Sequence, residues 1–138
     1  MLGKRKVRKY VFELVFGYEF NKDELPIDYY EKAYDNFVCA DDEEESVKTA
    51  FLGVCKNIDA IDSVITENLN GWKISRLSNA VLSIMRVSVY EMYFTSLHPA
   101  ISINEAVELA KEYGEDGAST YINGVLNNIS KNIKKDEE

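Results

Sequence analysis

The residues best suited to bind a ligand are the positive charges at the start of the chain. Five basic residues lie among the first nine, with no acid between them: Lys4, Arg5, Lys6, Arg8 and Lys9. Lysine and arginine neutralise phosphates, so this basic segment, residues 1–9, would bind a polyanion such as RNA. Judged from the residues alone, a solvated and poorly ordered N-terminus explains these charges slightly better, because short basic runs are common.

The basic residues share one helical face with aromatic side chains. Helical spacing places the following residues on one stripe: Arg5, Arg8, Lys9, Phe12 and Phe16. Such a stripe suits RNA, because cationic side chains meet phosphates while aromatic rings stack on unpaired bases. Aromatic residues at such spacing, among them Phe16 and Phe20, also suggest a surface for a protein partner. Burial of Phe16 and Phe20 under the next helix is an equally good alternative.

The sequence offers little for catalysis or metal binding. His98, the only histidine, precedes Pro99 in a predicted loop and has no base or ligand partner nearby in sequence. Cys39 and Cys55 lack CxxC spacing and indicate buried free thiols rather than a metal site or a disulfide. Neither a glycine-rich phosphate loop nor a nucleophile elbow is present. We therefore expect no enzyme activity, no metal site and no cofactor.

The charge is distributed unevenly along the chain. The formal net charge is −8, which argues against a general nucleic-acid binder. Without the basic segment, positions 10–138 hold 11 basic and 24 acidic residues. A polyanion should therefore bind locally, at the basic segment, and not across the whole surface.

Size and hydropathy predict one globular domain over residues 1–138. A chain of 138 residues is long enough for one core and too short for two ordinary domains. Its apolar runs are only a few residues long, so no segment is expected to span a bilayer. No secretory signal is visible at the start, and we expect the protein in the cytoplasm, away from the membrane.

Helical spacing recurs along nearly the whole chain, and only two prolines and seven glycines interrupt it. We expect an all-α bundle of six or seven helices, with a frayed tail over residues 134–138. The expected helices cover about 4–20, 26–39, 41–69 with a break within 57–62, 75–94, a segment from a capping box at Ser102 to Gly114, and a final helix before the tail. The helix over 75–94 is apolar nearly all round, which is typical of a buried centre.

Three sequence blocks stand in a fixed order in the second half of the chain: RLSNAVLSIMRVSVYE at 76–91, INEAVELAK at 103–111 and YINGVL at 121–126. Together they resemble the NusB family of bacterial transcription antitermination factors. The resemblance covers nearly the whole chain and is strongest from Arg76 to Ile129. It implies an all-helical bundle, in agreement with the spacing of apolar residues.

The resemblance also implies which residues bind RNA. NusB proteins bind the boxA RNA element partly through an arginine-rich N-terminal segment, which matches Lys4 to Lys9 here. Tyr121 matches an aromatic residue of the family, usually phenylalanine, that helps to contact the RNA. From its own spacing, Tyr121 would more simply pack beside the core. Gly117 stands where a compared family member has an acid, which puts the RNA contacts of that loop in question.

A protein partner is implied as well. The small-subunit ribosomal protein that doubles as NusE docks in this family on the first helix and the start of the central helix. The matching candidates here are Phe12, Phe16, Ser78 and Asn79. Ser78 and Asn79 replace an acid and a basic residue that are common in the family, and Ser83 replaces a frequent arginine.

We interpret the chain as an antitermination factor that binds boxA-like single-stranded RNA together with NusE. It would modify RNA polymerase elongation, notably on ribosomal RNA operons. The alternative is a non-catalytic protein-interaction module with little RNA affinity of its own. A homodimer that hides the RNA surface is a further alternative that one sequence does not decide.

Overall fold

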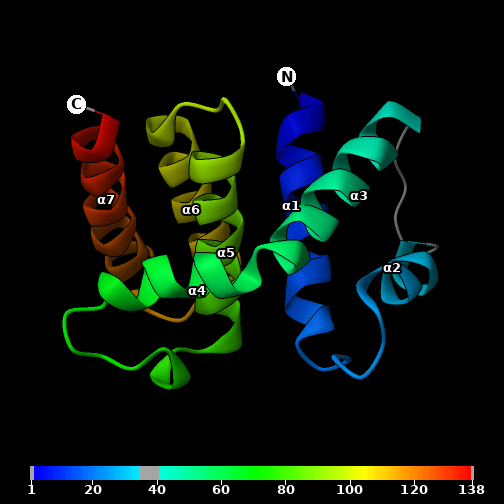
Figure 1. The fold of residues 1–138 in the computed structure, drawn as a ribbon, viewed down its shortest axis with the longest axis horizontal. Helices are drawn as coiled ribbons and strands as arrows, with labels where there is room; N and C mark the ends of the chain where they lie inside the picture. The colour runs from blue at the N-terminus through cyan, green and yellow to red at the C-terminus, as the bar shows by residue number, and fades with distance from the viewer. Residues whose placement is uncertain (1, 35–40, 138) are drawn as a thin grey trace. The chain divides into compact units, whose positions relative to one another are not determined.

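The protein is all-helical, as the spacing of its apolar residues predicts. The structure, a computed structural model, describes residues 2–34 and 41–137, with side chains from 5–33 and 43–133. These residues form seven α-helices and one 3₁₀ helix, without a strand among them (Figure 1). The chain divides into two compact units, Met1–Lys56 and Asn57–Glu138, which are described in turn.

The first unit holds three helices that all contact one another. They are α1 (Leu2–Tyr18), α2 (Pro26–Tyr34) and α3 (Asp41–Lys56). Helix α2 begins at Pro26 as predicted, because the fixed φ of proline suits the first helical position. Its predicted end near Cys39 lies outside the described residues.

An aromatic cluster holds the three helices of the first unit together. Phe51 of α3 is fully buried. Its ring lies 5.8 Å from Tyr18 of α1, edge to face, and 6.3 Å from Tyr30 of α2 in a stacked arrangement. Tyr29 of α2 adds a third ring at 6.1 Å. Such pairs contribute about 0.5–1.5 kcal/mol each beyond the burial of their area, so Phe51 links all three helices.

The second unit contains four α-helices and the 3₁₀ helix. In chain order they are α4 (Ile58–Glu67), η1 (Ile74–Arg76), α5 (Asn79–Phe94), α6 (Pro99–Tyr113) and α7 (Ala118–Glu137). Helices α5, α6 and α7 run side by side, and α4 crosses α5 and α7 (Figure 1). The predicted break is confirmed at Asn57. Helix α7 ends at Glu137, within residues 134–138, and the fraying of this tail stays a prediction. No described helix is long and apolar enough to cross a membrane.

Helix α5 is the buried centre of this unit, as its sequence predicts. Every residue from 81 to 89 is buried, on all sides of the helix. The helix begins at Asn79, later than the expected 75, because η1 occupies Ile74–Arg76. The Ser78 side chain caps it by accepting a hydrogen bond of 3.2 Å from the Val81 amide.

The predicted capping box at Ser102 is wrong. Helix α6 begins at Pro99, and the Nδ1 atom of His98 accepts the 3.1 Å hydrogen bond from the Ala100 amide that caps it. Ser102 lies inside α6, fully buried, and its hydroxyl lies 2.7 Å from that of Ser88 on α5. It also donates to Oε1 of Glu91 at 3.0 Å. The serine therefore joins two helices instead of starting one.

A paired charge links α4 to α5. Arg86 is only 5% exposed, and its Nε and Nη2 atoms donate to the two carboxylate oxygens of Asp62 at 2.9 and 2.8 Å. Two parallel hydrogen bonds between guanidinium and carboxylate fix both distance and orientation. The pair therefore sets how α4 lies against the buried centre of the second unit.

A substitution at Gly17 tests how closely α1 packs on α2. A Cβ atom at Gly17 would collide with the hydroxyl of Tyr29. We expect Gly17→Ala to lower the free energy of unfolding by about 1 kcal/mol or more, because overpacking outweighs the better helix propensity of alanine. Gly124→Ala in α7 is the matched control, since a Cβ there meets nothing within 4 Å. Urea denaturation should show this control unchanged or stabilised, and equal losses in both variants would contradict the packing argument.

Substitutions at Asp62 and Arg86 test the contribution of their ion pair to stability. Asp62→Ala leaves the Arg86 guanidinium buried without its carboxylate, so the free energy of unfolding should fall by about 3 kcal/mol. The double variant Asp62→Leu with Arg86→Met removes the stranded charge and should recover a large part of that loss. Thermal and urea unfolding measure both values. A double variant less stable than Asp62→Ala would show that the charge itself is not the cause.

Candidate nucleic-acid interface

The basic segment forms the first turns of α1, and its side chains differ in exposure. Arg5 is exposed, whereas Lys6 and Lys9 are half-buried. Arg8 is only 9% exposed. The side chain of Lys4 lies outside the described residues. Positive charges on the first turns oppose the helix dipole, so their position there costs stability and is compatible with an anionic ligand.

Lys6 lies over an aromatic ring of its own helix. Its Nζ atom is 5.8 Å from the centroid of the Tyr10 ring, at the spacing of one helical turn. Such a contact holds the lysine stem against the helix and leaves its ammonium group charged. Lys6 is therefore positioned along α1 before any ligand arrives.

The predicted basic and aromatic stripe is not exposed along its whole length. Arg8 and Phe12 are buried, with Phe12 only 2% exposed. Helical spacing explains this, because both residues fall on the stripe of Val11 and Val15, which are 2% and 5% exposed. The structure therefore contradicts an exposed Phe12 in a docking surface, and it leaves Arg8 little surface to offer a phosphate.

The aromatic part of the stripe reaches the surface further along the chain. The Phe16 ring lies 6.0 Å from Phe12 and 5.6 Å from Phe20, the second pair being edge to face. Phe16 is half-buried, and Phe20, just after the end of α1, is 69% exposed. An exposed ring supported by a second ring is suited to contact a partner.

The remaining predicted residues lie in the second unit. Ser78 is exposed but already acts as the cap of α5, which gives it a structural role of its own. Asn79, the first residue of that helix, is half-buried. Ser83, at the position where arginine is frequent in the family, is fully buried.

Tyr121 is half-buried on the first turn of α7, as its spacing predicts. Its hydroxyl oxygen is buried and has no hydrogen-bond partner among the described residues. Burial raises the pKa of this hydroxyl above its usual value of 10.0, because desolvation disfavours the phenolate. The hydroxyl therefore contributes no contact of its own, and any stacking would come from the partly exposed ring.

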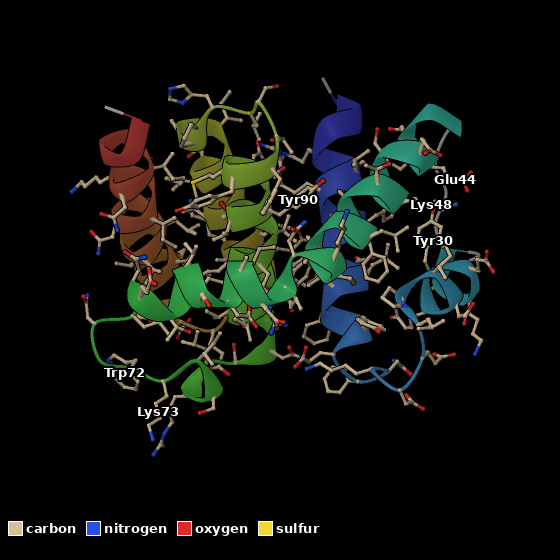
Figure 2. The ribbon with its side chains drawn as sticks, in the orientation of Figure 1. Tyr30, Glu44, Lys48, Trp72, Lys73 and Tyr90 are labelled. Carbon is tan, nitrogen blue, oxygen red and sulfur yellow. The ribbon has the colours of Figure 1, made fainter. Side chains whose placement is uncertain are left out.

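One exposed group of residues, at Trp72, was not predicted from the sequence. The Trp72 side chain is 62% exposed, in the loop between α4 and α5, next to the exposed Lys73 (Figure 2). The signal was available, because Trp72 is the only tryptophan and stands between a glycine and a lysine in a polar stretch. Among the described residues, no group of histidine, cysteine and acidic side chains is arranged to hold a metal ion.

The fold defines an all-helical protein, and comparison with known proteins gives its family. The family model described as the NusB family matches residues 5–131. The chain therefore belongs to the NusB family.

Two curated relatives carry the name Transcription antitermination protein NusB. A relative from a Nitratiruptor species is 34% identical over 134 residues, covering 97% of this chain and 96% of the relative. A relative from Clostridium perfringens is 35% identical over 136 residues, covering 96% of this chain and 100% of the relative. The similarity therefore extends over nearly the full length of both proteins.

Solved structures are similar over the same length. A structure of T. maritima NusB has a TM-score of 0.85 at 28% identity, covering 97% of this chain and 96% of that chain. A crystal structure of antitermination factors NusB and NusE in complex with dsRNA gives 0.84 at 25% identity, covering 96% and 98%. The all-helical NusB fold expected from the resemblance is confirmed.

Tyr121→Phe tests the buried hydroxyl. We expect the free energy of unfolding to rise by about 1 kcal/mol at pH 7, because an unpaired buried hydroxyl is removed. Above pH 10 the advantage should grow, since the unfolded tyrosine loses its proton first while the folded one, with its raised pKa, keeps it. Urea denaturation across pH measures both effects. Tyr90→Phe, on a half-buried ring, is the control and should change stability by less than about 0.5 kcal/mol.

Proposed function

We propose that this chain is a transcription antitermination factor that binds boxA-like RNA together with the ribosomal protein NusE. The observation that supports it most is the likeness, over 96% of the chain, to the NusB of a complex with NusE and dsRNA. The full-length similarity to relatives named for transcription antitermination agrees with it. The protein would act in the cytoplasm, where transcription takes place, and on ribosomal RNA operons in particular.

The RNA contact proposed for the first unit is electrostatic. Among the described side chains of the basic segment, Arg5 is the exposed cation, and Lys6 and Lys9 are half-buried. Lys4 belongs to the same segment, and Arg8 contributes positive potential from below the surface. Each cation near a phosphate releases counterions, so binding should depend strongly on salt. In the second unit, the Tyr121 ring is proposed to stack on a base.

The protein partner is proposed to contact aromatic residues of α1 and the start of α5. Phe16 and the exposed Phe20 offer ring surface, and Phe12 supports them from the core. Ser78 and Asn79 are the candidates at the start of α5. NusE would add its own RNA contacts, so that two weak interactions on one RNA strengthen each other. The assembled complex would then modify elongation by RNA polymerase.

The protein is proposed to act by binding and not by catalysis. Its one histidine, His98, accepts through Nδ1 the hydrogen bond that caps α6, so this nitrogen already has a structural role. Positioning of RNA and protein partners requires no chemical step. RNA turnover during binding assays would contradict this view.

A protein-interaction module with little RNA affinity is the second candidate. The burial of Arg8 favours it, because this leaves Arg5 as the one exposed cation among the described side chains of the basic segment. A homodimer is a third arrangement, in which two copies cover the RNA surface. Analytical ultracentrifugation with and without RNA separates monomer, homodimer and RNA complex.

Arg5→Gln tests the electrostatic contact. We expect weaker binding of a labelled boxA-like RNA, measured by fluorescence anisotropy over a range of salt concentrations. The slope of the logarithm of affinity against the logarithm of salt concentration should shrink by about 0.7, the value for one phosphate contact on a single strand. Lys56→Gln is the matched control, because Lys56 is an exposed cation of the same unit.

The control should leave both affinity and slope unchanged. Equal effects of the two substitutions would indicate general charge attraction instead of a local contact. No RNA binding by the wild-type chain, with or without NusE, together with an intact complex with NusE, would favour the interaction module.

A further inference from the structure

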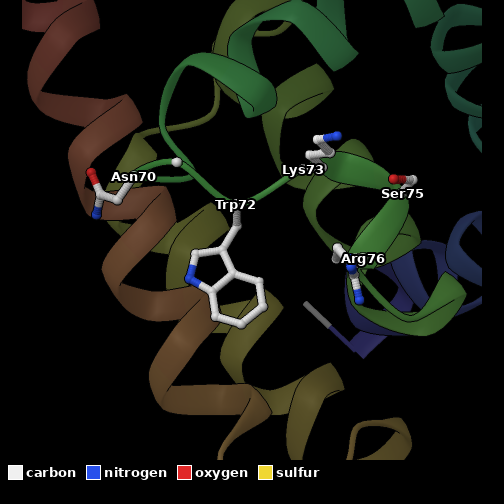
Figure 3. A pocket seen from close by; sticks show the side chains of 6 residues that line it. Asn70, Trp72, Lys73, Ser75 and Arg76 are labelled. Carbon is white, nitrogen blue, oxygen red and sulfur yellow. The ribbon is translucent and has the colours of Figure 1, made fainter.

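The loop between α4 and α5 forms an open pocket of about 650 Å³. Its lining comes from one short stretch of chain: Asn70, Gly71, Trp72, Lys73, Ser75 and Arg76 (Figure 3). We call this stretch the Trp72 loop. Most residues of the Trp72 loop are exposed, so the packing of the second unit does not explain why these residue types occur here.

The Trp72 ring extends away from the loop (Figure 3). It is 62% exposed, although tryptophan side chains are usually largely buried. Leaving so large an apolar ring in water forgoes stabilisation of about 1.5 kcal/mol or more. A ring in this position is suited to cover another flat apolar surface when a ligand binds.

The backbone holds Trp72 in this position. Asn70 and Gly71 both have positive φ, 52° and 91°, and turn the chain sharply before the tryptophan. The Trp72 amide donates to the carbonyl of Leu69 at 3.1 Å, and Leu69 is only 1% exposed. On the other side, the Arg76 amide donates to the carbonyl of Lys73 at 2.9 Å. The ring is therefore presented by a hydrogen-bonded turn anchored in the core.

The charged residues that line the pocket with Trp72 are positive, although the second unit as a whole has an excess of acidic residues. Residues 57–138 hold 12 acidic and 7 basic residues. Lys73 and Arg76 are both exposed, and neither forms an ion pair with a described residue. No acidic residue lines the pocket. An anionic ligand would pair with these two cations without first breaking an existing ion pair.

We propose that the Trp72 loop is a second RNA contact, in which Trp72 stacks on an unpaired base and Lys73 and Arg76 meet the adjoining phosphates. An open aromatic face beside two cations matches the alternation of base and phosphate in a single strand. A duplex hides its base faces and offers only phosphates. This inference rests on the proposed function for its ligand, but it concerns residues that the function did not assign.

The fluorescence of Trp72 provides a direct measurement, because it is the only tryptophan in the chain. The full-length protein is titrated with unlabelled oligouridine about 12 nucleotides long, within the range that one small single-strand site covers. We expect saturable quenching that weakens as salt rises. The same oligouridine paired with oligoadenosine should quench far less, because its bases are stacked inside the duplex.

Substitutions separate stacking from charge. Trp72→Ala should weaken binding of labelled oligouridine, measured by anisotropy, by about tenfold, as expected for loss of one stacked base. Lys73→Gln with Arg76→Gln should keep the tryptophan but reduce the salt slope by about 1.4. Lys131→Gln, at an exposed cation of α7, is the matched control and should leave quenching and slope unchanged. Thermal unfolding verifies that each variant is folded.

The outcomes distinguish this inference from the proposed function. RNA binding seen by anisotropy, with Trp72 fluorescence and the loop variants unaffected, overturns the second contact and leaves the function standing. Absence of RNA binding by the wild-type chain overturns both. Quenching by NusE alone, without RNA, would assign the Trp72 loop to a protein partner and reject the RNA contact.

Discussion

Arg86 places a positive charge inside the most buried helix of the second unit, and the surrounding packing must satisfy it. A guanidinium in an apolar interior is costly unless a carboxylate meets it with good geometry. Asp62 supplies that carboxylate from α4 through two parallel hydrogen bonds. Apolar contacts alone would let the two helices slide against each other, because such contacts have no preferred direction. The bidentate pair prevents this, so it fixes α4 against α5. The α4–α5 loop, with Trp72, therefore starts from a defined position.

Polar residues inside the same unit show how the specificity of packing is achieved. Ser88 and Ser102 share a hydrogen bond between α5 and α6, and Ser102 also donates to Glu91. Each buried polar group favours one alignment of its helix, since any other leaves it without a partner. The hydroxyls of Ser83 and Tyr121 are exceptions, because neither has a hydrogen-bond partner among the described residues. At Tyr121 the unpaired hydroxyl marks a place on α7 where stability is not at its maximum.

The sequence predicted the helical fold well, because its main signals are local. Proline at position 26 starts α2, and Asn57 interrupts the long apolar stripe before α4. The errors arose where a long-range contact competed with a local signal. Ser102 has the spacing of a capping box, yet its hydroxyl bonds to α5, and His98 caps the helix instead. Arg8 is basic but lies on the buried stripe of α1, which a count of charges does not reveal.

The same contrast applies to the candidate site. The distribution of charge along the sequence suggested one positive region, at the N-terminus. The exposure of the side chains instead shows which of the cations lie at the surface. Arg5 is exposed and Arg8 is buried. Lys73 and Arg76 line the same pocket as an exposed indole, which was not predicted as a site from the sequence. A body with an excess of acid repels polyanions generally, so it suppresses unspecific binding to nucleic acid. Binding then depends on local contacts in which cations and rings occur together, and an RNA must offer both phosphates and unpaired bases to use them. With the contacts proposed above, such a surface would favour single-stranded RNA over duplex without reading many bases.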